Sequence, residues 1–440
     1  MTPSRRGFLK GVAAGAAAAA WAGCRRGAPP REDGPPNVLL VVADDLGIGA
    51  LSLYGEAGIE TPRLARLAAE GMRFETVWST PLCTPSRVEL LTGRYPCRTG
   101  WTDNIQARFE PGFAGKRFVD PAWPSLGRVM RDAGYRTAVA GKWQLCRFDE
   151  RPDHPAELGF EEHRLWSWME KGSDGRALVQ TARYWNPSVV EGGVTTTRDG
   201  AYGPHLFRDF LADFMRRRRD EPFFAYYPMA LPHPPYQPPP SRAAAGDPAT
   251  RSSDPAFFPD MVAALDAIVG ELVDAVDALG LGARTLVLFT SDNGTPGEIP
   301  VRRHGVPGVG GKGTLSEAGV RVPLIARWTG VVAPGTVTPA LVDLSDVLPT
   351  LAELSGAADV PETDGVSFLP VLVGKEGARR TIFSQLGDAR AIRGRRWKLD
   401  SDVRLFDLVN DPLERFDLGA DPARKGLVDG LGEVLDAVCR

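Results

Sequence analysis

The sequence predicts an α/β protein with a large, mostly parallel central sheet covered by helices on both faces, followed by a small α+β subdomain with an antiparallel sheet. Two observations support this. Through most of the chain, continuous apolar segments alternate with segments of helical periodicity, as when parallel strands are buried on both faces. From residue 378 the segments become short and typical of hairpins. We therefore expect a large domain over 37–357 and a subdomain over 358–440.

Four apolar segments, each followed by polar residues, are the expected strands of the large sheet. They cover residues 37–43, 136–140, 222–231 and 284–290. The polar residues that follow them are Asp44-Asp45, Gly141-Lys142-Trp143-Gln144, Pro232-His233-Pro234 and Ser291-Asp292-Asn293-Gly294. Ligands bind where the carboxyl ends of such strands open into a crevice, so a site is expected there. Ordinary turn chemistry is the alternative, because Asp, Asn, Gly and Pro also favour strand ends.

Helices are expected between these strands and at the end of the chain. One begins at Thr61-Pro62 and runs to Gly71, and a longer one covers 257–279 with apolar residues at helical spacing. The subdomain is expected to contain strands at 381–384, 389–392, 397–399 and 405–408, and a last helix near 426–438.

Residues 1–36 are expected to be a signal and linker rather than part of the fold. Ser4-Arg-Arg-Gly-Phe-Leu-Lys10 is typical of a twin-arginine export signal, and the apolar segment 11–23 is too short to span a bilayer. The following Cys24 lies in a sequence similar to a lipoprotein cleavage site, and 25–36 is rich in Pro, Gly and charge. We expect export by the twin-arginine translocase to the periplasm, or a lipid anchor at Cys24 in the cell envelope. Lipidation stays open.

Composition excludes some classes of function. A net charge of −3 over 440 residues provides no field for nucleic acid, and no nucleic-acid motif is present. The cysteines other than Cys24 are scattered and form neither a disulfide framework nor a zinc motif. A single bridge between two of Cys97, Cys146 and Cys439 stays open, with Cys83 as the candidate odd thiol.

The polar strand ends suit a hard cation and an anionic substrate. Asp44, Asp45, Asp292 and Asn293 offer oxygen ligands of the kind that Ca²⁺ or, less favourably, Mg²⁺ prefers. Positive charge and donors for a tetrahedral anion come from Arg87, Lys142, His233 and Lys312. A phosphate or sulfate ester would fit. Cys83, beside an expected helix N-terminus, is the candidate nucleophile.

Cys83-Thr-Pro-Ser-Arg87, followed by Leu90-Leu-Thr-Gly-Arg94, resembles the signature of type I sulfatases, in the alkaline-phosphatase-like superfamily. Further segments resemble the family in order along residues 37–415. They include Asp44-Asp45, Gly141-Lys142-Trp143, Pro222-Phe-Phe, Pro232-His233-Pro234, Ser291-Asp-Asn-Gly294, Gly311 to Pro323, and Leu405 to Pro412.

This resemblance implies that a formylglycine-generating enzyme converts Cys83 to Cα-formylglycine, whose hydrate is the nucleophile. It implies calcium ligands at Asp44, Asp45, Asp292, Asn293 and the modified residue 83. Lys142, His233 and Lys312 would bind the sulfate, and Arg87 would orient the hydrate. One geminal hydroxyl would attack sulfur and expel the alcohol. The other geminal hydroxyl would then lose its proton, sulfate would leave, and the aldehyde would form again.

One position departs from the family. Gln144 stands where the family has a histidine that is thought to assist the elimination, and glutamine does not take up a proton near neutral pH. Slower turnover is expected, unless another histidine such as His304 acts instead. Two alternatives to a sulfatase remain: a phosphoester or phosphonoester hydrolase, and a weakly active or inactive protein that binds sulfated glycans. The substrate is not identified, and a sulfated polysaccharide, an aryl sulfate and choline sulfate all remain open.

Other residues are expected to be structural. Segment 147–205 is interpreted as irregular, with His154 and His163 at its surface and its aromatic residues packing the insertion. His205 is interpreted as structural, and Glu317 with Arg321 as a structural pair.

Overall fold

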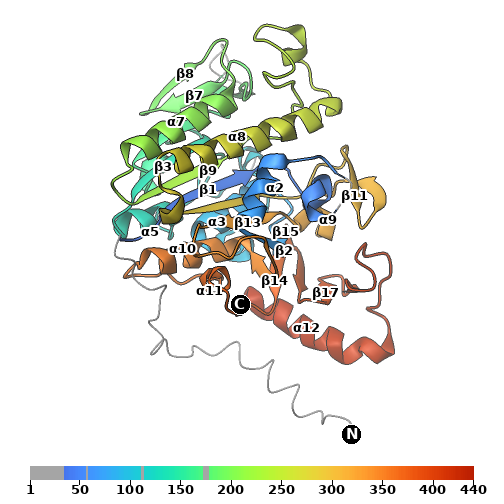
Figure 1. The fold of residues 1–440 in the computed structure, drawn as a ribbon. Helices are drawn as coiled ribbons and strands as arrows, with labels where there is room; N and C mark the ends of the chain where they lie inside the picture. The colour runs from blue at the N-terminus through green and yellow to red at the C-terminus, as the bar shows by residue number, and fades with distance from the viewer. Residues whose placement is uncertain (1–33, 56–57, 111–112, 172–177) are drawn as a thin grey trace.

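The structure, a computed structural model, describes residues 34–55, 58–110, 113–171 and 178–440. The expected export signal and the lipid anchor at Cys24 lie outside these residues. The centre of the structure is a ten-stranded sheet (Figure 1). Its strands lie in the order β14-β2-β13-β10-β1-β9-β3-β4-β7-β8. The strands of this sheet are β1 (Asn37–Ala43), β2 (Met72–Trp78), β3 (Arg136–Lys142), β4 (Glu162–Trp166), β7 (Ser188–Glu191), β8 (Val194–Thr197), β9 (Phe223–Pro228), β10 (Thr285–Ser291), β13 (Leu324–Arg327) and β14 (Thr336–Asp343).

The central strands are parallel, which confirms the predicted fold class. β10, β1, β9, β3 and β4 form parallel pairs, whereas β13, β7 and β8 pair antiparallel with their neighbours. Every residue of β1, β9 and β10 is buried, because helices cover both faces of the sheet. Ala43 pairs with Ser291, so β1 and β10 end at the same level. The polar residues after them therefore start side by side.

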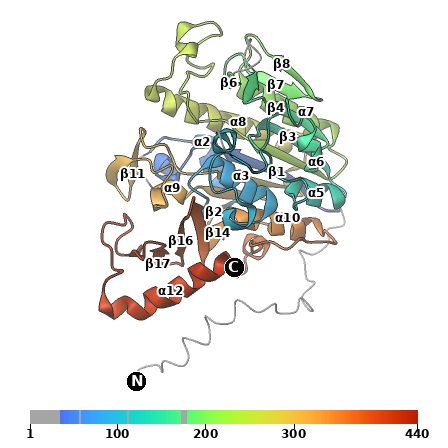
Figure 2. The ribbon, with the colours of Figure 1, turned by 180° about the vertical axis from the view of Figure 1, so that it is seen from behind.

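Helices form a layer on each face of the sheet. α2, α7 and α8 lie over one face (Figure 1), and α3, α5 and α10 over the other (Figure 2). The helices are α2 (Pro62–Ala69), α3 (Cys83–Thr92), α4 (Pro96–Thr99), α5 (Leu126–Asp132), α6 (His154–Glu157), α7 (Gly203–Arg217), α8 (Phe258–Ala278), α9 (Glu317–Val320), α10 (Val347–Ser355), α11 (Leu369–Leu372) and α12 (Lys425–Val438), with short 3₁₀ turns between them. The helices expected at 61–71 and 257–279 are α2 and α8.

The interpretation of segment 147–205 as irregular was wrong. It contains β4, β7 and β8, which extend the central sheet, and the small hairpin of β5 (Met169–Lys171) and β6 (Leu178–Gln180). β8 is exposed along its whole length, so its sequence, Val-Thr-Thr-Thr, lacks the apolar alternation that marks a strand. Sequence reasoning also missed β2, β13 and β14, which lie beyond the parallel centre.

The subdomain has the antiparallel sheet that was predicted. β15 (Ile382–Leu386), β16 (Ala389–Arg393), β17 (Trp397–Asp400) and β18 (Leu405–Asp407) pair in sequence order. α12 packs on this sheet through Leu435, in a small core that also takes Tyr95 from the large domain. By contrast, Phe368, Leu369 and Leu372 belong to the core of the large sheet.

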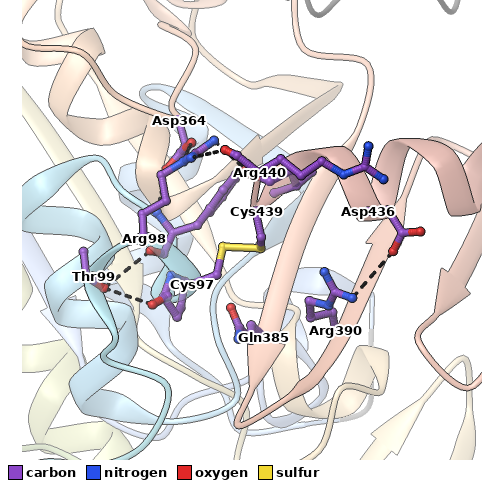
Figure 3. The surroundings of a disulfide bond; sticks show 12 residues. Cys97, Arg98, Thr99, Asp364, Gln385, Arg390, Asp436, Cys439 and Arg440 are labelled. Atoms are coloured by element: carbon purple, nitrogen blue, oxygen red, sulfur yellow. Dashed lines mark hydrogen bonds and ion pairs between the residues drawn. A yellow bond between two sulfur atoms is a disulfide. The ribbon is translucent and has the colours of Figure 1, made fainter.

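A disulfide joins the two parts of the molecule. Cys97, in α4, bonds to Cys439, after α12, across a sequence separation of 342 residues (Figure 3). Beside it, Arg98 pairs with Asp364 and donates to the Arg440 carbonyl. One of the bridges left open by the sequence is thus present, and Cys83 and Cys146 are free and buried.

A further two-stranded ribbon, β11 (Pro300–Arg303) and β12 (Val306–Val309), packs against the 3₁₀ turn Ile48–Ala50 and precedes Lys312 in the chain. Among the described residues, no helix combines the length and the apolar composition needed to cross a membrane.

Candidate active site

The polar residues after β1, β3, β9 and β10 meet at the carboxyl edge of the sheet, as predicted. Asp44, Asp45, Asp292 and Asn293 are each fully buried. The backbone N–H of Asp45 donates to Asp292 Oδ1 at 3.0 Å, and Asn293 Nδ2 donates to Asp45 Oδ1 at 2.7 Å. Asp45 has a φ of 69°, a left-handed conformation that costs energy unless such contacts hold it. The two strand ends thus form one cluster.

Three cationic side chains face the three carboxylates. Lys142 Nζ lies 2.6 Å from Asp44 Oδ2, and Lys312 Nζ lies 2.6 Å from Asp45 Oδ2. Arg87 Nε donates to Asp292 Oδ2 at 3.0 Å. Because these charges are buried, water screens them little.

His233 follows β9 and lies at the edge of the same cluster. Its Nε2 is 3.8 Å from Asp45 Oδ2. The side chain is 19% exposed, so it faces the opening of the site more than the carboxylates do.

Cys83 is the first residue of α3, and its side chain points into this cluster. Its Sγ, the atom that an aldehyde or hydrate oxygen would replace, donates to Asn104 Oδ1 at 3.3 Å and lies 4.0 Å from Gln144 Oε1. Ligand atoms of Asp44, Cys83 and Asp292 all lie within 4.8 Å of one another. Residue 83 therefore sits beside the carboxylates at a helix N-terminus, where a developing negative charge is favoured.

The charges perturb one another's protonation. Burial raises the pKa of Asp292 to about 7, and repulsion from Asp44 adds to this effect. Burial would also raise the pKa of Asp44, but the attraction of Lys142 and other cations holds it below its usual value. Burial lowers the pKa of His233 well below its usual value. Lys312 keeps a raised pKa despite burial because of Asp45.

The oxygen atoms of the cluster fit a hard divalent cation. Asp44 Oδ1 and Asn293 Oδ1 are buried and have no hydrogen-bond partner within the described chain. Buried polar atoms normally have partners, so these two oxygens call for a cation or a donor. Carboxylate and amide oxygens suit Ca²⁺ better than zinc. Asp44, Asp45, Asp292, Asn293 and residue 83 are the residues that would hold it.

The structure brings together every site residue named from the sequence: Asp44, Asp45, Cys83, Arg87, Lys142, Gln144, His233, Asp292, Asn293 and Lys312. His304 is placed elsewhere. It is exposed in the turn between β11 and β12, beside a small cavity that Glu317 and Arg321 also line. Gln144, whose backbone has a left-handed φ of 47°, directs its side chain toward Cys83 instead.

The prediction that His154 lies at the surface was wrong. It is fully buried, accepts a hydrogen bond from Trp143 Nε1 on Nδ1, and contacts the Val119 carbonyl through Nε2. Its role is to support the turn after β3. His205 packs edge-on against Tyr202. Glu317 pairs with Arg321 at 3.8 Å, but its closest partner is Arg393 at 2.6 Å.

Sequence reasoning missed two site residues, Asn104 and Arg183. Asn104 contacts Cys83 Sγ from a loop that has no distinctive sequence. Arg183 is 3% exposed, and its Nη1 donates to His233 Nδ1 at 2.7 Å. Its guanidinium also stacks on Trp166, 4.3 Å from the ring centre. Trp166 ends β4, so identifying that fifth parallel strand would have drawn attention to this residue pair.

Known proteins match this chain along most of its length. Residues 36–357 match the family model described as Sulfatase. Arylsulfatase A of Bos taurus is 37% identical over 385 residues, which cover 82% of this chain and 72% of the relative. N-acetylgalactosamine-6-sulfatase of Canis lupus familiaris is 33% identical over 381 residues, covering 80% and 69%.

Solved structures share the fold. The crystal structure of Ps i-CgsB superposes with a TM-score of 0.78 at 26% identity, over 92% of this chain and 93% of that one. The crystal structure of Ps i-CgsB in complex with k-i-k-neocarrahexaose superposes with a TM-score of 0.76 at 25% identity, over 92% of this chain and 93% of that one. The phosphonate monoester hydrolase of Agrobacterium radiobacter shares the fold alone. It superposes with a TM-score of 0.66 at 20% identity, over 92% of this chain and 95% of that one. With the family model matched over 36–357 and relatives more than 30% identical, this chain belongs to the sulfatase family, hydrolases of sulfate esters.

Proposed function

We propose that this sulfatase hydrolyses an O-sulfate ester of an aryl or carbohydrate alcohol, with a Cα-formylglycine hydrate made from Cys83 as its nucleophile and a bound calcium ion. The observation that supports it best is the position of Cys83 Sγ. It lies within 4.8 Å of one carboxylate oxygen of Asp44 and one of Asp292. Lys142 pairs with Asp44, Arg87 with Asp292, and Lys312 with the neighbouring Asp45.

The side chains divide the work by position. Lys142, Lys312 and His233 would donate to the sulfate oxygens, and Arg87 would orient residue 83. When bound, the divalent ion would supply the positive charge that holds the sulfate group against three carboxylates. The aldehyde hydrate would supply two hydroxyls, one to attack sulfur with release of the alcohol and one to lose its proton as sulfate leaves. Gln144 and Asn104 would hydrogen-bond to residue 83 without taking up a proton.

Mass spectrometry of the peptide containing residue 83 tests the nucleophile. Conversion of cysteine to formylglycine replaces sulfur with oxygen and lowers the mass of this peptide. Purified protein should carry that change and release sulfate from an aryl sulfate, and Cys83→Ala should do neither. An unmodified Cys83 in protein with full turnover would refute the proposed nucleophile. Faster release of phosphate from an aryl phosphate would favour a phosphoester or phosphonoester hydrolase instead. A modified protein with calcium that turns over no sulfate ester would favour the glycan-binding alternative.

Calcium removal tests the metal. Because the ion binds the folded state, a chelator should lower the melting temperature and abolish turnover, and Ca²⁺ should restore both. At a calcium concentration about a hundred times its dissociation constant, binding would add about 2.7 kcal/mol to the free energy of unfolding. Asp45→Asn should weaken this response to calcium. Restoration by Mg²⁺ but not by Ca²⁺ would identify the other hard cation.

The relatives suggest the substrate class. An N-acetylgalactosamine-6-sulfatase and a protein crystallised with k-i-k-neocarrahexaose are among them, which favours a sulfated glycan, while the arylsulfatase A relative favours an aryl sulfate. Comparing release of sulfate from an aryl sulfate and from sulfated oligosaccharides would separate the two.

We also propose export by the twin-arginine translocase, after a formylglycine-generating enzyme has acted on Cys83, with periplasmic or lipid-anchored protein as the result. The Cys97–Cys439 disulfide supports an oxidising compartment. Because that translocase carries folded proteins, modification would precede export. Fractionation of cells that produce the protein, with Arg5 and Arg6 replaced by lysine as the control, tests this route.

A further inference from the structure

Lys312 is held differently from the other site cations. Lys142 ends strand β3, whereas Lys312 lies in the loop between β12 and α9. Two backbone hydrogen bonds fix this loop from the site side: Lys312 N–H donates to the Thr295 carbonyl and Gly313 N–H to the Pro81 carbonyl, both at 3.0 Å. The loop thus contacts both the segment after Asn293 and the turn before Cys83.

The small subdomain holds the same loop from the other side. Lys398, on β17, donates through Nζ to the Leu315 carbonyl and to Glu414 Oε1. Glu414 Oε2 in turn accepts from the backbone N–H of Glu317 at 2.7 Å. Both ends of the segment 315–317, three to five residues after Lys312, are therefore bonded to charged side chains of the subdomain.

These charged groups are buried. The side chains of Lys398 and Glu414 are 2% and 7% exposed, and Glu317 and Arg393, which pair beside them, are 4% and 6% exposed. Glu414 also has a left-handed φ of 58°. A buried ion pair is weak support for stability, because desolvation of both charges offsets their attraction. A strained residue within such a pair indicates that geometry is being held.

We propose that Lys398 and Glu414 are positioning residues for Lys312: the subdomain fixes the Lys312 loop so that its ammonium group meets the sulfate group. This inference rests on the proposed function of Lys312 as a sulfate-binding residue. Displacement of a binding group by about 1 Å can lower turnover on the order of 10²-fold. Loosening the loop should therefore weaken binding of the sulfate group without removing any group that touches it.

A double-mutant cycle tests this. The variants are Lys398→Met with Glu414→Gln, which removes both charges of the pair, Lys312→Ala, and all three substitutions together. kcat/KM for an aryl sulfate and calorimetric affinity for inorganic sulfate are measured for each. When Lys312 is present, we expect the two substitutions at Lys398 and Glu414 to lower kcat/KM and the sulfate affinity by about 10-fold each. When Lys312 has been replaced by alanine, the same two substitutions should have little further effect. Lys398→Arg should retain most of the activity.

Arg396→Met provides the matched control, because Arg396 pairs with Asp407 on the same small sheet, and the arginine is half exposed. It should leave both quantities unchanged. An equal loss in the presence and absence of Lys312, or no loss at all, would overturn the proposal. The sulfate affinity is measured without turnover, so it tests the positioning role even if no sulfate ester is hydrolysed. Failure of the proposed function would appear separately, as absent turnover in the unaltered chain.

Discussion

Gln144 is the site residue that departs from the family pattern. It lies 4.0 Å from Cys83 Sγ, as the resemblance led us to expect for the family's histidine, yet it has no titratable group. Asn104, the other side chain at Sγ, is likewise an amide. Both can hold residue 83 by hydrogen bonds, and neither can accept its proton near neutral pH. Slow release of sulfate follows as the expected behaviour of the unaltered chain.

Replacement of Gln144 by histidine should therefore speed turnover. General acid–base catalysis contributes about 10²–10⁴-fold, so we expect kcat for an aryl sulfate to rise by at least about 10²-fold, with little change in KM. Histidine also tolerates the left-handed φ of this position. Gln144→Asn is the control, because it adds no proton acceptor. Equal kcat values for Q144H and the unaltered chain would show that proton transfer at this position does not limit the rate.

Arg183 extends the positive charge of the site beyond the residues that the sequence identified. Arg183→Met removes a buried donor to His233, and hydrogen bonds to charged groups are worth about 1.5–3 kcal/mol. We expect kcat/KM for a sulfate ester to fall by about 10-fold or more, mainly through KM. Arg164→Met, which removes an arginine paired with Glu191 on the same insertion, should have no such effect. Similar losses for the two variants would mean that Arg183 acts through general stability.

Among the elements, the last helix is held by a covalent link as well as by packing. α12 has one fully buried residue, Leu435, and lies against the small sheet. The Cys97–Cys439 disulfide and the contacts of Arg98 fix its end to α4 (Figure 3). Five further apolar residues of α12 pack against the same core in partly buried positions: Leu427, Val428, Leu431, Val434 and Val438. The cross-link therefore adds to apolar packing in fixing this helix.

Removing this disulfide should lower stability. A native disulfide typically contributes about 2–5 kcal/mol, largely by restricting the unfolded chain, and this one closes a loop of more than three hundred residues. We expect Cys97→Ala with Cys439→Ala to lower the free energy of unfolding in urea by about that amount. Cys146→Ala controls for the loss of a thiol, since Cys146 is free. An unchanged midpoint would show that packing alone fixes α12.

On the scale of the whole molecule, burial sets the response to pH. His154 lies in the core against Trp143 and Phe118, and burial lowers its pKa to about 4. The unfolded chain binds a proton on this histidine near pH 6.5, before the folded chain does. Above pH 6.5 the histidine is neutral in both states and burial carries no protonation penalty. As the pH falls from 6.5 toward 4, the unfolded chain gains a proton that the folded chain does not, so the free energy of unfolding decreases.

Between pH 6.5 and pH 4, this histidine should lower the free energy of unfolding by about 3 kcal/mol. This decrease should be measured as the difference between the unaltered chain and His154→Gln in urea unfolding at pH 7 and pH 4. Histidines common to both proteins cancel in this difference, which should narrow as the pH falls. A difference that is the same at both pH values would show that His154 does not titrate over this range.

Much of the fold and site follows from the sequence alone. β1 and β10 are uninterrupted apolar segments, so their type and their polar ends could be predicted from composition and order. The parallel pairing of β1 and β10 in the structure then brings Asp44 close to Asp292, because both residues follow aligned strands. The ordered motifs around Cys83 and Lys312 identified the family, which the comparisons confirm.

Other features were decided by tertiary structure. Edge strands such as β8 are exposed to solvent, so their sequence lacks the apolar pattern by which a buried strand is recognised. Arg183 and Asn104 reach the site from loops whose sequence does not fix their direction, and Lys398 and Glu414 contact the Lys312 loop from residues more than eighty positions away. Local composition determines which segments form buried strands. Contacts between distant segments depend on how loops and subdomain pack, which no short pattern encodes.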